Sequence, residues 1–448
     1  MTRRESCPSL IHSVELTHSA PPTVGQCPNS MEEYMKKRYG VASVLAAAAL
    51  VASAVVGAPA NAAGRTIVVW ADEQRGPQLQ KLIDGNTTIA PGYTIQVKFF
   101  SALDALQSAW DKSSAAGGPD VLTGPASMAA AGGKSGKLAR ILLDSATRRD
   151  TPSSAIAAMS YKGNVYGVAL DVDTTAFLWN KSLFGSTAPA TFGDMVDYYK
   201  TNKSAKGLTG GICAFEGTWG SQAVLTALGG GAWGYKGSNA QFSNVLLNSS
   251  TFKSNVTKYL LDGSKSNGFF QWDGCGDAFK AGKIPFAITG AWNFDGITKA
   301  GISYGLGATP GLTKGTYGAQ WVNYSGAYVT SYAKAHGVDL GARKLVVGWF
   351  ASRAGQLAMS GLSKRPPASI SATSGVSDAQ TLAVGRAAAT GTPQISPALD
   401  DKTGGSNWYD TLGSVYTDVF TKGKDLNATL DAAAAILKKN FAAYAASL

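Results

Sequence analysis

The sequence has 448 residues, of which 45% are hydrophobic and 15% are charged, and its formal net charge is +11. The chain is longer than an ordinary domain of about 100 to 200 residues, so two lobes are expected, and the composition argues against a disordered or membrane protein. Lys and Arg are scattered as singles and pairs, with no basic run interleaved with aromatics, so the charge does not indicate nucleic-acid binding.

The amino-terminal region has the three parts of an export signal. Lys36–Arg38 form a positive segment, an apolar stretch from Val41 to Val56 follows, and Ala60-Asn61-Ala62 is typical of a cleavage site. The apolar stretch is shorter than the roughly 20 residues of a membrane span, although a retained membrane anchor stays open as the alternative. We predict that residues 1–62 are a leader and signal peptide, and that the protein is exported to the periplasm or the extracellular face of the cell envelope.

Strand and helix patterns alternate along the rest of the chain, which predicts an α/β fold with a largely parallel sheet. Loops at the carboxyl ends of such strands carry binding residues, and Asp72, Glu73 and Arg75 occupy the first of them. A helical pattern follows Pro77, and the tail from Trp408 to Leu448 is mostly helical. No long linker separates two domains, so the chain is expected to cross between its lobes more than once. The predicted strands are 65–70, 93–100, 119–122, 166–170, 177–179, 211–215, 284–289 and 327–330.

Two cysteines remain after the predicted cleavage point, Cys213 and Cys275. An exported chain with two cysteines favours one disulfide, but two buried thiols stay open, because the sequence does not show whether the two lie close together. No cysteine directly follows the apolar stretch, so we expect a free exported protein rather than one held by a lipid anchor.

Six short motifs occur in a characteristic order. They are VVWADEQRG at 68–76, GGPD at 117–120, YKGNVYGV at 161–168 with WNK at 179–181, FKAGKIPFAITGAWNFDGI at 279–297, ISYGLGATP at 302–310 and KRPPAS at 364–369. Each motif is weak alone, but the ordered series covers nearly all of residues 65–448. In this series the chain resembles the extracellular solute-binding proteins of the maltose/maltodextrin class.

This resemblance implies a type II periplasmic-binding fold, in which two α/β lobes joined by crossover hinge strands hold a sugar in the cleft between them. The first lobe is expected to contain 65–172 with 311–365, and the second 176–307 with 372–448. The implied function is to bind a maltodextrin-like oligosaccharide as a monomer and deliver it to the membrane subunits of an ABC importer. Neither catalysis, nor a cofactor, nor a metal is expected.

The resemblance also implies a set of ligand-binding residues whose chemistry suits a sugar. Carboxylates and Arg bind hydroxyls at the edge of a pyranose, and flat aromatic rings cover its C–H faces. Each of these residues also has an ordinary structural interpretation, since tryptophans are commonly core residues and loop carboxylates commonly cap helices. The expected ligand-binding residues are Asp72, Glu73, Arg75, Asp173, Glu216, Trp219, Trp292 and, as a late aromatic, Trp408 or Tyr409.

One position departs from the family pattern. After the third strand the family has an aspartate that binds sugar, whereas this chain reads Gly124-Pro125-Ala126-Ser127-Met128, with Ser127 in the place of that aspartate. The glycan or its register in the site is therefore expected to differ from that of maltose.

Two other classes of function remain as alternatives. One is a binding protein of the same fold for another sugar, a peptide or a polyamine, because fold alone does not determine the ligand. The other is a glycosidase that uses two of Asp72, Asp173 and Glu216, although no catalytic signature surrounds these carboxylates. Histidine chemistry is disfavoured because His336, in a predicted surface turn, is the one histidine beyond the leader.

Overall fold

The computed structural model describes residues 65–447 except 73–74, 87, 237–238 and 395–406, and side chains as far as 442. The predicted leader and signal peptide at 1–62 lies outside these residues. None of the helices in the described part combines the length and the apolar character that crossing a membrane would require.

Ten strands of the described chain form one mixed sheet. Along the sheet the order is β12-β7-β13-β6-β17-β3-β1-β2, with β14 beside β6 and β18 beside β17. Two blocks, β2-β1-β3 and β13-β7-β12, are parallel, and the antiparallel strands β6 and β17 join them. The strands are β1 (Arg65–Ala71), β2 (Tyr93–Phe99), β3 (Val121–Pro125), β6 (Gly167–Asn180), β7 (Ile212–Ala214), β12 (Phe270–Gln271), β13 (Phe286–Gly290), β14 (Tyr304–Gly307), β17 (Trp321–Val329) and β18 (Thr392–Pro393).

The two joining strands are longer than the sequence pattern predicted. The predicted strands at 166–170 and 177–179 are parts of the single 14-residue strand β6, and the strand predicted at 327–330 begins already at Trp321 in β17. Between Val168 and Asn180 there is neither Gly nor Pro, so nothing in the sequence interrupts the strand. The first half of β6 pairs with β17 and its second half with β13 and β14.

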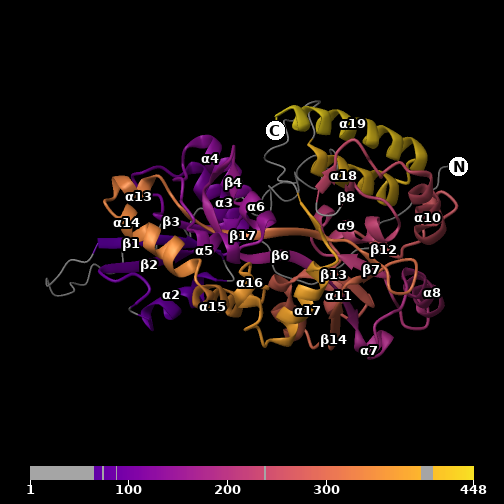
Figure 1. Ribbon diagram of the computed structural model, residues 1–448. Helices are drawn as coiled ribbons and strands as arrows, with labels where there is room; N and C mark the ends of the chain where they lie inside the picture. Colours follow the sequence, from indigo (N-terminus) through magenta and orange to yellow (C-terminus); the bar gives the residue numbers. More distant parts are fainter. Residues whose placement is uncertain (1–64, 73–74, 87, 237–238, 395–406, 448) are drawn as a thin grey trace, which may run out of the picture. The chain divides into compact units, whose positions relative to one another are not determined.

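The hydrophobic interior divides into two principal cores. One contains buried side chains from 67–170 and 324–368, and the other contains buried side chains from 177–288 and 408–441 together with Trp321. A smaller cluster around Leu178, Ile284 and Val384 is formed by buried residues of 176–297 and 384–387. The chain therefore passes between the cores three times, along β6, along β17 and after Ala368, and β6 and β17 run between the two groups of elements (Figure 1). The two-lobed α/β architecture is confirmed.

Helices surround the sheet, and the predicted helical tail is present. The helices before β6 are α2 (Gly76–Asp84), α3 (Leu103–Lys112), α4 (Ser127–Ser135), α5 (Ser145–Asp150) and α6 (Ser153–Ala158). Between β6 and β17 lie α7 (Lys181–Phe184), α8 (Phe192–Asn202), α9 (Thr218–Ala227), α10 (Ser250–Leu260), α11 (Gly276–Lys280), the 3-10 turn η1 (Ala291–Asn293) and α12 (Phe294–Lys299). After β17 come α13 (Tyr332–Ala335), α14 (Asp339–Arg343), the π-helix η2 (Lys344–Phe350), α15 (Arg353–Ser363), α16 (Ile370–Thr373), α17 (Ala379–Ala388), α18 (Trp408–Tyr416), the π-helix η4 (Thr417–Thr421) and α19 (Leu426–Ser447).

Four short antiparallel pairs lie outside the main sheet. They are β4 (Ser160–Tyr161) with β5 (Asn164–Val165), β8 (Gly234–Lys236) with β9 (Asn239–Gln241), β10 (Leu261–Asp262) with β11 (Lys265–Ser266), and β15 (Thr309–Pro310) with β16 (Tyr317–Gly318).

A disulfide joins the two cysteines of the described chain. Cys213 on β7 is bonded to Cys275 at the start of α11, and both side chains are buried. The bond ties the central strand of the second parallel block to the helix that precedes β13.

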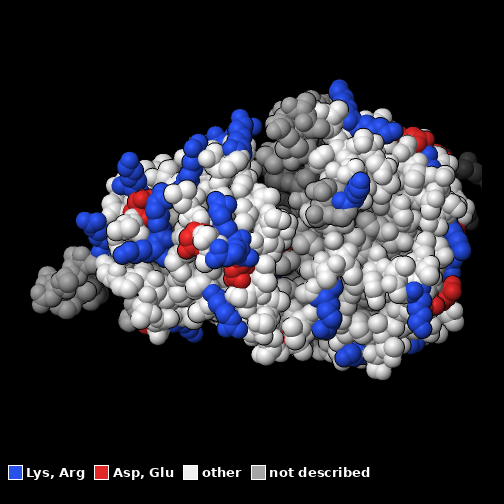
Figure 2. All heavy atoms as spheres, viewed as in Figure 1, with Lys and Arg blue, Asp and Glu red and all other residues white. Residues whose placement is uncertain are grey.

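Basic side chains are distributed over the surface. Figure 2 shows Lys and Arg in several separate groups across the visible face, with fewer acidic side chains between them.

Candidate functional site

A cavity of about 410 Å³ lies where the two halves of the sheet meet. This volume is within the range of about 300 to 1,000 Å³ that is usual for small-molecule sites. Asp72, Leu103, Gln107, Pro125 and Ser127 line it from the first half, and Asp173, Asn323, Ser325 and Arg365 from the crossover segments. Trp219, Trp292, Gln394 and Tyr409 complete the lining.

The topology of the sheet explains why these residues meet. Asp72 follows β1 and Ser127 follows β3, and both strands end at the same edge because they are parallel. Trp219 and Trp292 likewise follow the parallel strands β7 and β13 of the second block. The cavity therefore lies between the carboxyl ends of the two parallel blocks.

On the crossover strands, polar residues alternate. Asp171 and Asp173 are two residues apart on β6, and the register places them opposite Ser325 and Asn323 of β17. Since strand side chains alternate between faces, each pair of residues two apart shares a face. This pattern gives the centre of the sheet a polar patch at the level of the cavity.

Arg75 is fully buried beneath this patch and holds two carboxylates together. Its guanidinium donates to Asp72 and, at 2.6 Å, to Asp171 Oδ2. Asp171 is itself completely buried and also accepts a hydrogen bond from Ser363 at 3.0 Å. Arg75 therefore ties the loop after β1 to the crossover strand β6, and it presents no side-chain surface to solvent.

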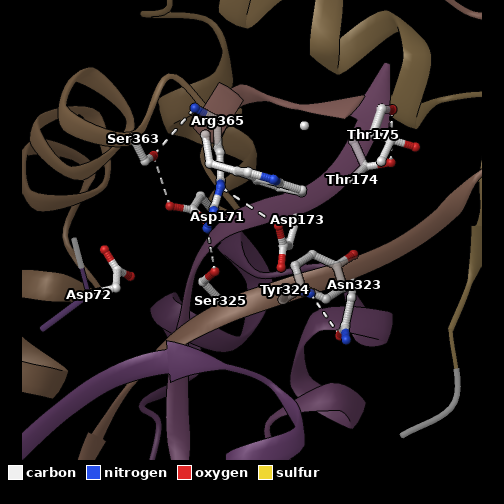
Figure 3. Close-up of polar contacts among 12 residues, drawn as sticks. Asp72, Asp171, Asp173, Thr174, Thr175, Asn323, Tyr324, Ser325, Ser363 and Arg365 are labelled. Carbon is white, nitrogen blue, oxygen red and sulfur yellow. Dashed lines mark hydrogen bonds and ion pairs between the residues drawn. The ribbon is translucent and has the colours of Figure 1, made fainter. Parts of the chain in front are cut away.

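Arg365 forms the second cationic centre of the patch (Figure 3). Its Nη1 donates to Ser325 Oγ at 2.9 Å and lies 3.7 Å from Asp171 Oδ1, while its Nε lies 3.7 Å from Asp173 Oδ1. The residue follows α15, where the chain crosses between the cores for the third time. All three crossover segments thus meet at Arg365.

Burial and ion pairing shift the pKa values of this network in different directions. Burial alone would raise the pKa of Asp171, but the charges of Arg75 and Arg365 and its hydrogen bonds hold that pKa below the ordinary value. Burial raises the pKa of Asp173, and Arg365 offsets this only in part. Burial opposes the charge of Arg75, yet Asp171 and Asp72 raise its pKa. Asp171 and Arg75 therefore both favour their charged forms, and Asp173 is the easier carboxylate to protonate.

Two indoles form the aromatic wall of the cavity. The rings of Trp219 and Trp292 are 5.6 Å apart between centroids and tilted by 40°. Trp219 Nε1 donates to Gln394 Oε1 at 3.0 Å, and that oxygen also accepts from Asn323 at 3.3 Å. Tyr409, from α18, completes this wall, and burial raises its pKa to about 12. The hydrogen bonds fix the orientation of the Trp219 ring.

Glu216 lies behind the aromatic wall. Its Oε1 accepts from Trp292 Nε1 at 2.9 Å and from Asn293 Nδ2 at 3.0 Å, and it also accepts from the Thr289 hydroxyl. Burial raises the pKa of Glu216 to about 7, even though these hydrogen bonds favour the charged form. The carboxyl group supports Trp292 and is absent from the lining of the cavity.

The structure brings some of the predicted ligand-binding residues together and separates others from them. Arg75 lies beneath the polar patch and Glu216 behind the aromatic wall, and neither lines the cavity. Trp408 is fully buried in the second core against Trp233 and Trp321. Glu73 lies outside the described residues. The predicted residues that line the cavity are Asp72, Asp173, Trp219, Trp292 and Tyr409, together with Ser127 at the position of the family aspartate.

Several lining residues were not anticipated from the sequence. Arg365 lies within the KRPPAS motif itself, and the motif could have suggested it. Asn323 and Ser325 are polar residues with a two-residue spacing in a strand, a pattern that indicates one polar face. For Gln394, no local signal distinguishes it from a loop residue.

The described residues offer no cluster of three or more His, Cys, Asp or Glu side chains that could hold a metal ion. His336, the histidine predicted in a surface turn, follows α13 and bonds Asp120 and the Ala115 carbonyl. Neither of these partners lines the cavity. The groups that line the cavity are hydrogen-bonding, ionic and aromatic side chains, which suit ligand recognition.

Comparison with known proteins agrees with this geometry. Residues 87–383 match the model of a family described as bacterial extracellular solute-binding protein. The chain is also similar to the galactooligosaccharide-binding protein of Bacillus subtilis (strain 168), with 24% identity over 288 residues, which cover 62% of this chain and 67% of that protein.

Proposed function

Since the chain belongs to the bacterial extracellular solute-binding proteins, we propose that it captures an oligosaccharide outside the cytoplasmic membrane and delivers it to the membrane subunits of an ABC importer. Membership of an extracellular family means that the chain is exported, and we propose that residues 1–62 direct this export. In this proposal the protein acts as a monomer.

The observation that carries the proposal is the combination of an indole wall with a polar edge in one cavity. Trp219 and Trp292 offer flat apolar rings, and Asp72, Asp173 and Asn323 line the same space. A pyranose presents C–H groups on its faces and hydroxyls on its rim, so it matches both kinds of surface. Rigid rings make such contacts at little cost in side-chain entropy.

Two ligand series follow from two different observations. The ordered motifs of the sequence favour a maltodextrin-like α-glucan, and the similarity to a galactooligosaccharide-binding protein favours a galactoside. Ser127, which lines the cavity, both donates and accepts hydrogen bonds, whereas the family aspartate only accepts. We propose the maltodextrin series first and the galactooligosaccharide series second.

The three crossover segments provide a physical basis for capture. We propose that 65–172 with 311–365 and 176–307 with 372–448 move as two lobes about β6, β17 and the segment after α15. A sugar that contacts cavity residues of both lobes would bind the closed arrangement more tightly than the open one, and that difference in affinity is what favours closure. The closed, loaded protein would then dock on the importer.

Titration calorimetry on the chain from Ala63 onward tests this proposal with maltose, maltotriose, β-1,4-galactobiose and β-1,4-galactotriose. Saturable binding of one series is expected, with small-angle scattering showing a smaller radius of gyration in the bound form. Trp292→Ala should weaken binding about tenfold or more through the lost ring contact. The matched control is Trp272→Ala, since Trp272 is partly buried against Tyr416 and does not line the cavity.

The same samples separate the alternative functions. Chromatography of the sugar after titration detects hydrolysis, which would favour the glycosidase alternative. Binding of spermidine or of a tripeptide, with no response to any sugar, would favour a different solute on the same fold. If none of the four sugars binds, both ligand series are ruled out, while the assignment of the chain to the solute-binding family still holds.

A further inference from the structure

Glu216 occupies an unusual position for a carboxylate near a sugar site. The residue follows β7 and lies directly behind the aromatic wall, where one of its two carboxylate oxygens accepts all the side-chain hydrogen bonds that it receives from the described residues. Oε1 accepts from Trp292 Nε1, from Asn293 Nδ2 and from Thr289 Oγ1, with the Gly290 amide at 3.5 Å. Asn293 also donates to the Thr289 hydroxyl at 2.8 Å, so the donors form one connected network.

The second oxygen faces the protein. Oε2 of Glu216 is buried and accepts no hydrogen bond from the described residues. A Cβ atom added at Gly220, on α9, would stand 3.2 Å from it, so Oε2 points at the backbone of that helix. With Oε1 occupied by protein donors and Oε2 directed at α9, neither oxygen is available to a sugar hydroxyl.

The indole that Glu216 holds is fixed from other sides as well. A Cβ atom at Gly290 would meet the six-membered ring of Trp292 at 2.0 Å, so this ring lies directly on the Gly290 backbone. The guanidinium carbon of Arg365 is 5.0 Å from the ring centroid, and the Trp219 ring is 5.6 Å away. Glu216 supplies the hydrogen-bond acceptor for the indole nitrogen, which fixes the rotation of the ring about its side-chain bonds.

We propose that Glu216 is the positioning residue of the stacking platform: it fixes the indole of Trp292 toward the cavity and so sets ligand affinity without touching the ligand. This inference rests on the proposed function for its effect on affinity. Its structural part, the control of the Trp292 indole by Glu216, stands independently of any sugar. A fixed ring enhances binding because its conformational entropy is lost on folding rather than on ligand binding.

The electrostatics of the site support this role. Burial raises the pKa of Glu216 to about 7, so the group changes charge near neutral pH. A titratable side chain that feels its charge is Tyr409 on α18, whose pKa is raised by burial and by the charges of Glu216 and Asp410. A charged acceptor binds an indole N–H more strongly than a neutral one. Protonation of Glu216 therefore loosens the platform, and the indole reports this change.

The first experiment observes the indole directly. Nuclear magnetic resonance spectra of the ¹⁵N-labelled chain from Ala63 onward give one signal for each tryptophan indole N–H, and Trp292→Phe identifies the signal of Trp292. This signal is expected to shift between pH 5 and pH 9 with a midpoint near 7, and the pH-dependent shift should vanish in Glu216→Gln. Asp431→Asn, which changes an exposed carboxylate, should leave the signal and its titration unchanged. A Trp292 signal that titrates identically in Glu216→Gln would overturn the proposal.

The second experiment is a double-mutant cycle on the sugar that binds wild type most tightly among the four in the calorimetric panel. Glu216→Gln is expected to weaken binding about tenfold when Trp292 is present and less than about twofold in the Trp292→Ala background. Equal losses in the two backgrounds would mean that Glu216 contacts the sugar itself, which contradicts the positioning role.

A gentler variant covers the case in which Glu216→Gln does not fold. Thr289→Val removes one donor from the network at nearly constant volume. It should shift the Trp292 indole signal and weaken ligand binding in the same directions as Glu216→Gln, but by smaller amounts. An unchanged indole signal in this variant would count against the proposal. If wild type binds none of the sugars, the proposed function fails, and the indole titration still decides whether Glu216 positions Trp292.

Discussion

The guanidinium carbon of Arg365 lies 5.0 Å from the centre of the Trp292 ring, which connects the third crossover segment to the aromatic wall of the second half. The same guanidinium is within 3.7 Å of the carboxylates of Asp171 and Asp173 on β6. Arg365 thus links the crossover strand to the aromatic surface on which we propose a sugar stacks. Few other side chains could make both contacts, since a planar cation that stacks and also donates in a fixed fork is specific to Arg.

Replacing Arg365 tests whether this planar geometry matters. Arg365→Lys keeps the charge but loses the stacking on Trp292 and the fork toward Ser325, so the free energy of unfolding should fall by about 1 kcal/mol and ligand affinity should fall as well. Arg365→Ala should lower the free energy of unfolding by about 3 kcal/mol, because the fully buried Asp171 and the largely buried Asp173 lose a nearby cation. Chemical denaturation and calorimetry measure both effects.

Arg353→Lys is the matched control, because Arg353 is exposed and its Nε donates to the Ser371 carbonyl oxygen at 3.2 Å. Its stability and affinity should remain close to those of wild type. If Arg365→Lys behaved like this control, the stacking contact would have no energetic role.

The space beneath Trp292 leads to a second prediction. Gly290 has an extended backbone that any residue can adopt, so Gly290→Ala would be harmless but for its Cβ, which would meet the Trp292 ring at 2.0 Å. The ring must move, so we expect weaker sugar binding and a loss of about 1 to 3 kcal/mol in the free energy of unfolding. Gly296→Ala serves as the control, since nothing lies within 4 Å of its Cβ position on α12. That change should preserve affinity and stabilise by up to about 1 kcal/mol. Equal behaviour of the two variants would contradict this account.

The sequence predicted the fold better than the site. Alternating strand and helix patterns are local, so the α/β fold and the helical tail could be predicted from the chain itself. The sheet is mixed rather than largely parallel, because β6 and β17 pair antiparallel with each other and with β3, β13 and β14. The fusion of 166–170 with 177–179 into β6 could not be foreseen, because the polar residues between them are explained only by the partner strand β17. Strand length depended on tertiary pairing rather than on local propensity.

At the site, the sequence indicated several residues that line the cavity but not where each predicted residue lies. Arg75 and Asp171 are 96 residues apart, and no local pattern shows that they pair with each other and so do not line the cavity. Trp408 and Tyr409 are neighbours on α18, where successive side chains point about 100° apart, so one is in the core while the other reaches the cavity. The sequence alone left this choice open.

The disulfide between Cys213 and Cys275 gives a third prediction. The bond closes a loop with a sequence separation of 62 residues, so removing it should lower the free energy of unfolding by about 4 kcal/mol through the gain in entropy of the unfolded chain. Denaturation of Cys213→Ser/Cys275→Ser, compared with wild type with and without reductant, measures this effect. Neither cysteine lines the cavity, so sugar affinity should persist where the variant is folded. Two free thiols in the unfolded, unreduced wild type would show that the bond does not form.

His336 provides a fourth prediction, which concerns pH. Its Nδ1 lies 2.6 Å from Asp120 Oδ1 and its Nε2 lies 2.5 Å from the Ala115 carbonyl oxygen. Both partners are acceptors, so the doubly protonated ring satisfies them best, and the hydrogen bond to Ala115 together with Asp120 raises the pKa of His336 above 6.5 against the opposing effect of burial.

A raised pKa in the folded state means that the folded protein holds this proton more tightly than the unfolded chain. The stabilisation is therefore fully present below the unfolded pKa of about 6.5 and is lost as the pH rises through the folded pKa. His336→Asn should lower the free energy of unfolding at pH 6 by about 1 kcal/mol and have a smaller effect at pH 9. Because His336 is the one histidine from Ala63 onward, a single imidazole signal in proton magnetic resonance reports its titration. A midpoint below 6.5, or an equal cost of the mutation at both pH values, would show that the imidazolium does not stabilise the contact between the end of α13 and Asp120.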